Sequence, residues 1–339
     1  MPKIDDMKDL FLGASWFTTI DIASGFHHIE MFEADKRKTA FSTMNGHYEW
    51  NVMPFGLKNA PIVFQRVISN LLQKHKMHKF AVNYIDDIII FSKSFEEHLA
   101  HLKLLFEMVE KENITLKLSK CQFAKASVVY LGFRISENQF APLRSNTEAI
   151  EKAPAPKDLK SLRGFLGKIN FYQKFIPNRA ALLYPLYQLL KKGQDFSWGE
   201  EEQKAFDEVK EILTSYPVLR IFDPSFKTFL YTDASRLGLG AVLKQSDPAD
   251  STGSQFVIGY FSKSLTPYQA NYSVTELELL AIISAIDYWH FYLIGKPFTV
   301  ITDHMPLKAV GKIGKPNTRL FNWSIRLRQY DFKVEYRSG

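Results

Sequence analysis

The stretch FAVNYIDDIIIFS, at residues 80–92, decides the fold. Its two β-rich runs, Phe80–Tyr84 and Ile88–Ser92, flank a short acidic connection, and this pattern predicts a β-hairpin. Asp86 and Asp87 then lie side by side at the turn, between apolar strands. Two neighbouring carboxylates in an apolar setting repel each other and lose hydration, and a divalent cation offsets both costs. The simpler interpretation is that the acids only cap the turn, and this stretch alone leaves both interpretations open.

A third acid, Asp21, ends an apolar β-rich run at Trp16–Ile22. A carboxylate from another strand would let two metal ions bind about 4 Å apart, which is the arrangement used for phosphoryl transfer. Between these strands, Pro61–Lys74 has the apolar spacing of a helix with Pro in its first turn. The sequence therefore predicts a mixed α/β unit with acids at its strand ends.

A second helix follows the hairpin, because Ser94 and Glu97 have the spacing of a capping box. It should end near Asn113. The residues expected on its apolar face are Leu99, Leu102, Phe106 and Val109. Val128–Ile135 predicts a further strand pair.

The character of the chain changes after about residue 137. The Ala-Pro-Ala-Pro segment at residues 153–156 is typical of a stiff linker. Helical patterns follow at Leu159–Phe175 and Glu200–Ser215. The strands predicted beyond them are Lys227–Asp233, Leu237–Gln245, Phe256–Ser262, Phe298–Thr302 and Phe332–Tyr336. We therefore expect an α/β (α+β) fold with divisions at 1–136, 137–225 and 226–339.

A second group of acids occupies the last part. Asp233 and Asp303 each end an apolar strand, and Glu278 lies on the helix predicted at Thr275–Ile294. Carboxylates from two strand ends and a helix can converge over a sheet and bind metal. Glu276 is explained by the helix start, where it completes a capping box with Ser273.

Composition limits the class of protein. The 339 residues are 46% hydrophobic and 23% charged, which is globular rather than disordered or fibrous. The longest stretches without Asp, Glu, Lys or Arg, Ser251–Ser262 and Ser264–Thr275, are shorter than the roughly 20 residues of a membrane span. A lone cysteine, Cys121, excludes an internal disulfide. The net charge of +7 suits a polyanionic partner.

Four motifs in order resemble the reverse transcriptase palm. They are Phe17-Thr-Thr-Ile-Asp21-Ile-Ala-Ser-Gly-Phe26, Met53-Pro-Phe-Gly-Leu-Lys-Asn-Ala-Pro61, Tyr84-Ile-Asp-Asp87 and Tyr130-Leu-Gly132. The subfamily that they resemble most is the gypsy-type polymerase of long-terminal-repeat (LTR) retrotransposons. The resemblance implies a palm with partial fingers over 1–136 and a helical thumb-like or connection-like region over 137–225. It implies that Asp21, Asp86 and Asp87 are the catalytic metal ligands.

The resemblance also assigns substrate-binding roles to Phe26, Phe55, Gly56, Tyr84, Lys120, Leu131 and Gly132. Phe26 corresponds to an aromatic gate against the ribose 2′-hydroxyl, although its residue type alone would place it in a core. Phe55 and Gly56 would border the incoming nucleotide. Lys120 corresponds to a lysine near the triphosphate, and a surface lysine is the alternative.

The last part resembles the RNase H domain fused to such polymerases. Tyr231-Thr-Asp233, Thr275-Glu-Leu-Glu278 and Thr302-Asp303-His304 carry this resemblance, which makes Asp233, Glu278 and Asp303 catalytic metal ligands. The family has a fourth acid further downstream, beyond the point where this sequence stops, and its fingers begin upstream of the first residue. We therefore expect three acids here and treat nuclease activity as open. His304 is a weaker candidate for proton transfer.

A basic cluster near the end is a further candidate surface for nucleic acid, with a solvated helix face as the alternative. Its members are Lys315, Arg319, Arg326 and Arg328, with Phe321 and Trp323 between them.

The resemblance implies an RNA-directed DNA polymerase with a fused RNase H-like domain. Its partners would be an RNA template, a DNA primer, an RNA/DNA hybrid and deoxynucleoside triphosphates (dNTPs). Mg²⁺ would be the cofactor, with Mn²⁺ as the alternative ion. The alternatives are a catalytically incomplete nucleic-acid-binding remnant and an RNase H-type nuclease alone. No membrane partner is expected, a homodimer is left open, and an intracellular place in a cytoplasmic particle or the nucleus follows only from the resemblance.

Overall fold

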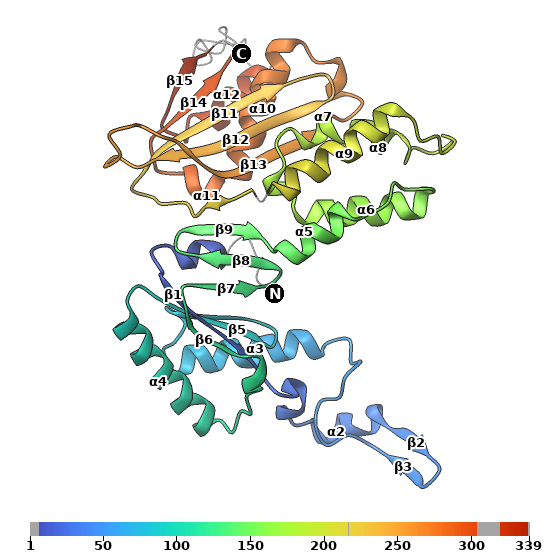
Figure 1. Ribbon diagram of the computed structural model, residues 1–339, viewed down its shortest axis with the longest axis vertical. Coiled ribbons are helices and arrows are strands. Elements are labelled where there is room, and N and C mark those ends of the chain that lie inside the picture. The colour runs from blue at the N-terminus through green and yellow to red at the C-terminus, as the bar shows by residue number, and fades with distance from the viewer. Residues whose placement is uncertain (1–6, 216, 304–318, 338–339) are drawn as a thin grey trace. The chain divides into compact units, whose positions relative to one another are not determined.

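A computed structural model describes residues 7–215, 217–303 and 319–337 of the chain. Close contacts divide the chain into two compact units, one up to Phe140 and one from Ala141 onward (Figure 1). Among the described residues, no helix is long and apolar enough to cross a membrane.

The first unit is built on a sheet with the strand order β4-β5-β1-β6. Its strands are β1 (Trp16–Asp21), β4 (Ala81–Tyr84), β5 (Asp87–Ser92) and β6 (Gln122–Lys125). The predicted hairpin forms, with Tyr84 paired to Asp87 across its turn. Strand β1 lies antiparallel to β5 in a register that sets Asp21 opposite Asp87. Directly opposed residues of an antiparallel pair have side chains on one face, so these two carboxylates are neighbours.

Helices α3 (Ala60–Lys74) and α4 (Phe95–Lys111) share a hydrophobic core with this sheet. The capping box predicted at Ser94 forms in part, since the Ser94 side chain accepts a hydrogen bond from Glu97 N–H but the Glu97 carboxylate accepts from Lys93 N–H instead of Ser94 N–H. The predicted apolar face of α4 is wrong in part, since Leu99 and Phe106 are exposed. The residues buried on this helix are His98, Leu102, Leu105 and Met108. Polar His98 lies on the buried face of α4, where its ring makes two buried hydrogen bonds.

The rest of the first unit consists of short elements. These are η1 (Asp9–Phe11), η2 (Gly25–His28), α2 (Glu33–Lys36), η3 (Arg37–Thr39), β2 (Phe41–Thr43), β3 (Gly46–Tyr48), η4 (Leu118–Lys120), β7 (Ser127–Tyr130) and β8 (Phe133–Ser136). Strands β7 and β8 form the strand pair predicted at Val128–Ile135. Strands β2 and β3 form a hairpin whose residues are all exposed. Strand β9 (Gln139–Pro142) crosses the border between the units.

The second unit begins with helices. They are α5 (Arg144–Glu151), α6 (Leu159–Phe171), η5 (Gln173–Phe175), α7 (Arg179–Leu182), α8 (Tyr184–Gln188) and α9 (Glu200–Thr214), followed by the short strand β10 (Leu219–Arg220). Helix α6 starts at a capping box between Asp158 and Ser161. Its buried residues recur at helical spacing, which leaves the opposite side of the helix exposed.

A mixed sheet completes the second unit, in the order β13-β12-β11-β14-β15. Its strands are β11 (Lys227–Ala234), β12 (Gly238–Ser246), β13 (Phe256–Ser264), β14 (Phe298–Thr302) and β15 (Phe332–Tyr336). The elements beside them are η6 (Gln269–Asn271), α10 (Val274–Tyr288), α11 (His290–Leu293) and α12 (Arg319–Leu327). Residues of α10 share a core with Leu230 of β11 and Leu243 of β12, so this helix covers one face of the sheet.

One helix was predicted over Thr275–Ile294, and the structure divides it at Trp289. Trp289 adopts a non-helical backbone (φ −103°, ψ 26°) and its ring is buried in the core. The break also brings the His290 ring within 2.7 Å of the Tyr330 hydroxyl. Side-chain packing therefore overrides the helical pattern at this point.

Candidate metal and nucleic-acid sites

The acidic turn of the first unit has a backbone conformation that costs free energy. Ile85 has a φ of 55°, in the left-handed region that β-branched residues rarely occupy. Side chains next to the turn hold its peptide groups by hydrogen bonds. Ile85 N–H donates to the side-chain oxygen of Gln65 at 2.7 Å. The Asn83 amide donates to the Ile85 carbonyl at 3.3 Å. These bonds fix the turn that presents Asp86.

Gln65 and Asn83 belong to a buried polar network that the sequence analysis missed. Gln65 donates to the Asn83 carbonyl at 3.0 Å, and the Ser69 hydroxyl donates to the Asn83 side-chain oxygen at 2.9 Å. The side chains of Gln65 and Asn83 are almost fully buried. The signal that could have revealed them is Gln65 and Ser69, one helical turn apart on a helix that faces the sheet.

Asp21, Asp86 and Asp87 crowd negative charge at the sheet edge. Burial raises the pKa of Asp87, and the charges of Asp86 and Asp21 raise it further. Lys120 opposes them, since its Nζ lies 3.2 Å from Asp21 Oδ2. A group of neighbouring carboxylates that repel one another is suited to binding a cation.

Two cavities meet at Asp21 and Lys120. The larger, of about 540 Å³, is also lined by Asp87, Leu131 and Gly132. The smaller, of about 180 Å³, is also lined by Phe26, Phe55 and Asp86. The structure therefore brings most of the predicted substrate-binding residues around the acids.

Tyr84 and Gly56 are not among the described residues that line these cavities. Tyr84 instead closes the turn opposite Asp87. The Phe26 ring packs against Phe64 and Phe55, with ring centres 5.5 and 5.4 Å away. The gate candidate is thus supported by the core on one side and faces the small cavity on the other.

Tyr130 adds a contact to the acidic strand. Its hydroxyl donates to the Asp87 carbonyl at 3.2 Å, and burial raises its pKa well above the usual range. The hydroxyl therefore stays protonated and remains a donor. Since Tyr130 precedes Leu131 and Gly132, it ties their turn to the start of β5.

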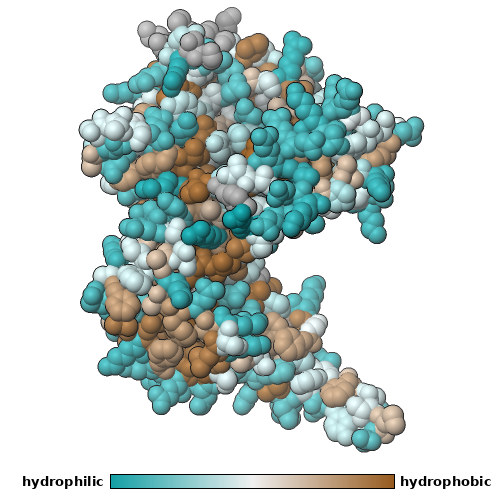
Figure 2. All heavy atoms as spheres, viewed as in Figure 1, coloured by the Kyte–Doolittle hydropathy of each residue, from teal (hydrophilic) through white to brown (hydrophobic). Residues whose placement is uncertain are grey.

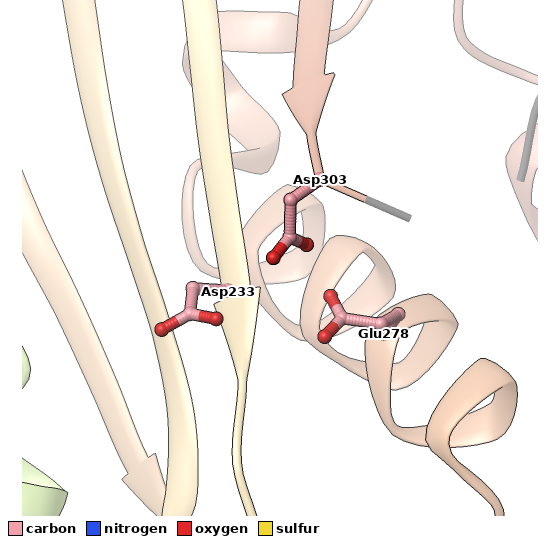
Figure 3. A group of neighbouring side chains, drawn as sticks. All are labelled: Asp233, Glu278 and Asp303. Carbon is pink, nitrogen blue, oxygen red and sulfur yellow. The ribbon is translucent and has the colours of Figure 1, made fainter. Parts of the chain in front are cut away.

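Three acids of the second unit lie close together. The ligand atoms of Asp233, Glu278 and Asp303 all lie within 4.8 Å of one another, and Figure 3 shows the three carboxylates turned toward a common space. Asp233 comes from β11, Glu278 from α10, and Asp303 follows β14. Among the described residues, this is the one group of three His, Cys, Asp or Glu side chains that meets this spacing.

Glu278 shows that a metal ion fits this group. Its side chain is 4% exposed, and its Oε2 has no hydrogen-bond partner. Burial raises the pKa of Glu278 to about 7, with further contributions from Asp303 and Asp233. A buried, unpartnered carboxylate oxygen beside two other acids is what a hard divalent cation requires.

A cavity of about 530 Å³ adjoins these acids. It is lined by Asp233 and Asp303, by Tyr231 and Tyr260 of the sheet, and by Asn178 of the helical region. Arg337 lines it as well.

Two members of the basic cluster near the end are paired with carboxylates. Arg319 pairs with Glu276 at 2.9 Å and lies over the ring of Tyr272. Arg326 pairs with Asp287 at 2.7 Å. The carboxylates of α10 thus neutralise two of its members. Lys315 lies outside the described residues, as does His304.

Three histidines of the first unit bond polar side chains close to them. His98 bonds the hydroxyls of Thr18 and Ser92 at 2.7 and 2.8 Å, and His101 bonds Ser92 at 2.8 Å. His75 bonds Glu112 at 2.7 Å.

Comparisons with known proteins match both parts of the chain. Residues 2–135 match the family model described as reverse transcriptase (RNA-dependent DNA polymerase). Residues 198–300 match the model described as RNase H-like domain found in reverse transcriptase.

Curated relatives match over the whole chain. The chain is 39% identical over 340 residues to the retrovirus-related Pol polyprotein from transposon 297 of Drosophila melanogaster, covering 100% of this chain and 31% of that protein. It is 37% identical over 345 residues to the transposon Tf2-3 polyprotein of Schizosaccharomyces pombe, covering 100% of this chain and 25% of that protein. The chain therefore spans a third or less of the length of these relatives.

Solved structures confirm the predicted fold class. The foamy viral protease-reverse transcriptase dRH in complex with double-stranded DNA matches with a TM-score of 0.83 and 22% identity, covering 100% of this chain and 60% of that one. The foamy viral protease-reverse transcriptase in complex with an RNA/DNA hybrid matches with a TM-score of 0.75 and 22% identity, covering 98% of this chain and 45% of that one. Residues 2–135 therefore match a reverse transcriptase domain and residues 198–300 an RNase H-like domain, and the whole chain is similar to part of the Pol polyproteins of transposons.

Proposed function

We propose that this chain is the catalytic segment of an RNA-directed DNA polymerase, which extends a DNA primer on an RNA template from dNTPs. The observation that carries the proposal is the pairing of Asp21 with Asp87 on adjacent strands, beside the rigid turn that presents Asp86. Template-directed nucleotidyl transfer needs acids held at fixed spacing beside an open cavity.

Asp21, Asp86 and Asp87 would hold Mg²⁺, with Mn²⁺ as the alternative ion. A bound pair of such ions activates the primer 3′-hydroxyl and stabilises charge on the triphosphate. The protein fixes where this happens, because Asp21 and Lys120 lie between the two cavities. We assign the larger cavity, with Leu131 and Gly132, to the primer end.

The smaller cavity would receive the nucleotide sugar. Phe26 lines it and is backed by Phe64, so its ring cannot easily retreat from an added 2′-hydroxyl. We therefore propose that Phe26 selects deoxyribonucleotides.

An aromatic path leads away from this cavity. Neighbouring ring centres are 5.3 Å apart for Phe55 and His27, 5.5 Å for His27 and Trp50, and 6.0 Å for Trp50 and Phe41. The path ends on the β2–β3 hairpin, at the lower right of Figure 2, where hydrophobic surface is exposed around Phe41 and Met44. Exposed rings suit stacking of single-stranded bases without regard to sequence, as a template requires.

Helix α6 would follow the duplex product through its minor groove. Its exposed residues include Lys160, Arg163, Gly164, Gly167 and Lys168. No heavy atom lies within 4 Å of a Cβ built on either glycine, so the helix backbone can approach a flat partner closely. The cations on either side can contact phosphates, which gives binding without base specificity.

Nuclease action on the RNA strand of a hybrid is the second candidate function, favoured by the three converging acids of the second unit. Asp233, Glu278 and Asp303 would hold the metal, and a bound divalent ion activates water for attack on a phosphodiester.

Primer extension on an RNA template with dNTPs and Mg²⁺ tests the polymerase. We expect extension by the wild type and by Asp195→Asn, an exposed control, and loss of extension in Asp86→Asn. Retained hybrid binding without extension in any of them would favour a binding remnant. Cleavage of the hybrid's RNA strand without extension would favour the nuclease alone.

A further inference from the structure

The cavity beside Asp233 and Asp303 has a wall from outside the RNase H-like sheet. Asp233 lies opposite Gly240, and Tyr231 lies opposite Val242, so these residues share one face. That face is turned away from α10, because the alternate residues pack with the helix in the core. On this side, Asn178 closes the cavity.

Asn178 is seated firmly against the sheet. Its φ of 44° is left-handed, a conformation that Asn adopts more easily than most residues. A Cβ on Gly240 would lie 2.5 Å from Asn178 Oδ1, so only glycine leaves room for the amide. Ala180 N–H donates to the Ser262 hydroxyl at 2.8 Å, which fixes the segment on β13.

The Asn178 amide is nevertheless free to bind. The residue is exposed, and within the described part of the chain its side chain makes no hydrogen bond. An amide carries both donors and an acceptor, and it can reach a ribose or phosphate oxygen without adding charge.

Arg337 supplies the opposite charge in the same cavity. Its backbone N–H donates to the Thr302 carbonyl at 3.0 Å, which fixes the residue beside the end of β14. Among the described residues its guanidinium has no ion pair. Guanidinium groups bind phosphate oxygens in a planar, bidentate manner.

We propose that Asn178 and Arg337 seat one phosphodiester of a nucleic-acid strand beside Asp233 and Asp303. Arg337 binds the phosphate, and Asn178 holds the adjoining backbone against Gly240. This seat rests on the proposed metal site of the second unit, and it makes Asn178 a strand-binding residue contributed by the helical region.

Localised radical cleavage tests the seat without requiring hydrolysis. Fe²⁺ replaces Mg²⁺ on the full chain bound to an end-labelled RNA/DNA hybrid, and ascorbate with peroxide generates radicals at the bound ion. We expect a discrete cleavage position in the wild type, at least fivefold weaker cleavage in Asn178→Gly and Arg337→Gln, and a larger loss in Asn178→Asp. Glycine keeps the left-handed backbone, so Asn178→Gly removes the amide without strain.

Matched controls separate the seat from general effects. Asn113 also has a left-handed backbone, with φ 52°, and lies in the first unit, so Asn113→Gly should cleave like the wild type. Arg66→Gln removes an exposed cation from α3 and should do the same. Gly240→Ala should match Asn178→Gly, because the added methyl displaces the amide.

The failures are distinguishable. Asp233→Asn must abolish localised cleavage, and a wild type without it would remove the metal site and the seat together. Cleavage lost in Asp233→Asn but unchanged in Asn178→Gly and Arg337→Gln would overturn the seat alone. A double-stranded DNA duplex run in parallel shows whether the seat prefers a hybrid.

Discussion

Gln65 and Ile85 are joined by a hydrogen bond of 2.7 Å, from the Ile85 backbone N–H to the Gln65 side-chain oxygen. It ties a helix to the turn where β-branched Ile85 is left-handed and where Asp86 is presented. A left-handed residue of this type costs about 1–3 kcal/mol and persists only where its surroundings hold it. Gln65 is therefore a positioning residue for the acids.

Gln65→Met should cost about 1–3 kcal/mol of unfolding free energy, because it leaves the half-buried Ile85 N–H without its side-chain partner. Primer extension should fall in kcat more than in KM, since the acids lose their fixed spacing. Denaturant unfolding and steady-state extension measure the two effects. Gln73→Met, an exposed change on the same helix, should alter neither, and equal effects at both positions would contradict the assignment.

Gly25→Ala should destabilise the first unit. The added Cβ would lie 2.7 Å from Cζ of Phe64, a ring that is buried and backs Phe26. Overpacking of this kind costs about 1–3 kcal/mol. Urea unfolding measures it, and the ratio of ribonucleotide to deoxyribonucleotide incorporation reports any shift of Phe26.

Gly164→Ala should stabilise the protein, unlike Gly25→Ala, and it tests the proposed duplex-binding face of α6. This glycine is exposed in mid-helix with open space around it, so alanine should stabilise by about 0.5–1 kcal/mol. Duplex affinity should nevertheless fall, because the methyl group separates the helix backbone from the groove. Unchanged affinity in a more stable protein would remove α6 from the proposed duplex contact.

Acid should weaken the first unit through its buried histidines. Burial lowers the pKa of His98, and the neighbouring His101 lowers it further, while Glu97 acts in the opposite direction. The unfolded chain therefore binds protons more readily, and stability is lost as the pH falls below about 6.5.

Unfolding free energies at pH 7.5 and 5.5 measure this loss. His98→Gln should be less stable at both pH values but should lose less between them. His78 is exposed, so His78→Asn should lose as much as the wild type. A wild type equally stable at both pH values would rule out a role for this network.

Glu278→Gln should stabilise the metal-free protein by about 2 kcal/mol at pH 8, because a neutral amide replaces a buried charge that two other acids repel. The gain in melting temperature on adding Mg²⁺ should shrink. Glu276→Gln provides the contrast two residues earlier, where the carboxylate accepts from Ser273 N–H and pairs with Arg319. Glu276→Gln should be less stable than the wild type. Calorimetry with and without EDTA distinguishes the two variants.

Local signals in the sequence were reliable where one short contact decides the structure. The capping box at Ser273 and the hairpin at Asp86 form as predicted, and Ser94 caps its helix although Glu97 accepts from Lys93 N–H instead. The motifs around the acids also identified the family. These features depend on residues within about four positions of one another, which a pattern can record.

Features decided by distant partners were not predictable. Which face of α4 is buried depends on His98, whose partners Thr18 and Ser92 lie on two strands. Charges on α10 neutralise Arg319 and Arg326, which had suggested a nucleic-acid surface. No spacing rule connects such residues, because only the folded sheet and its helices bring them together.

The place of Asn178 also bears on how the nuclease-like domain can be inherited or exchanged. A fragment that begins at Lys227 retains all three acids but loses the segment that packs on Gly238 and Gly240. Transplanted alone, it would carry its catalytic groups into a new protein with one side of their cavity open. Homology at the acids is therefore a poor guide to where this domain can be cut, and an exchange that keeps it intact has to begin upstream of Pro177.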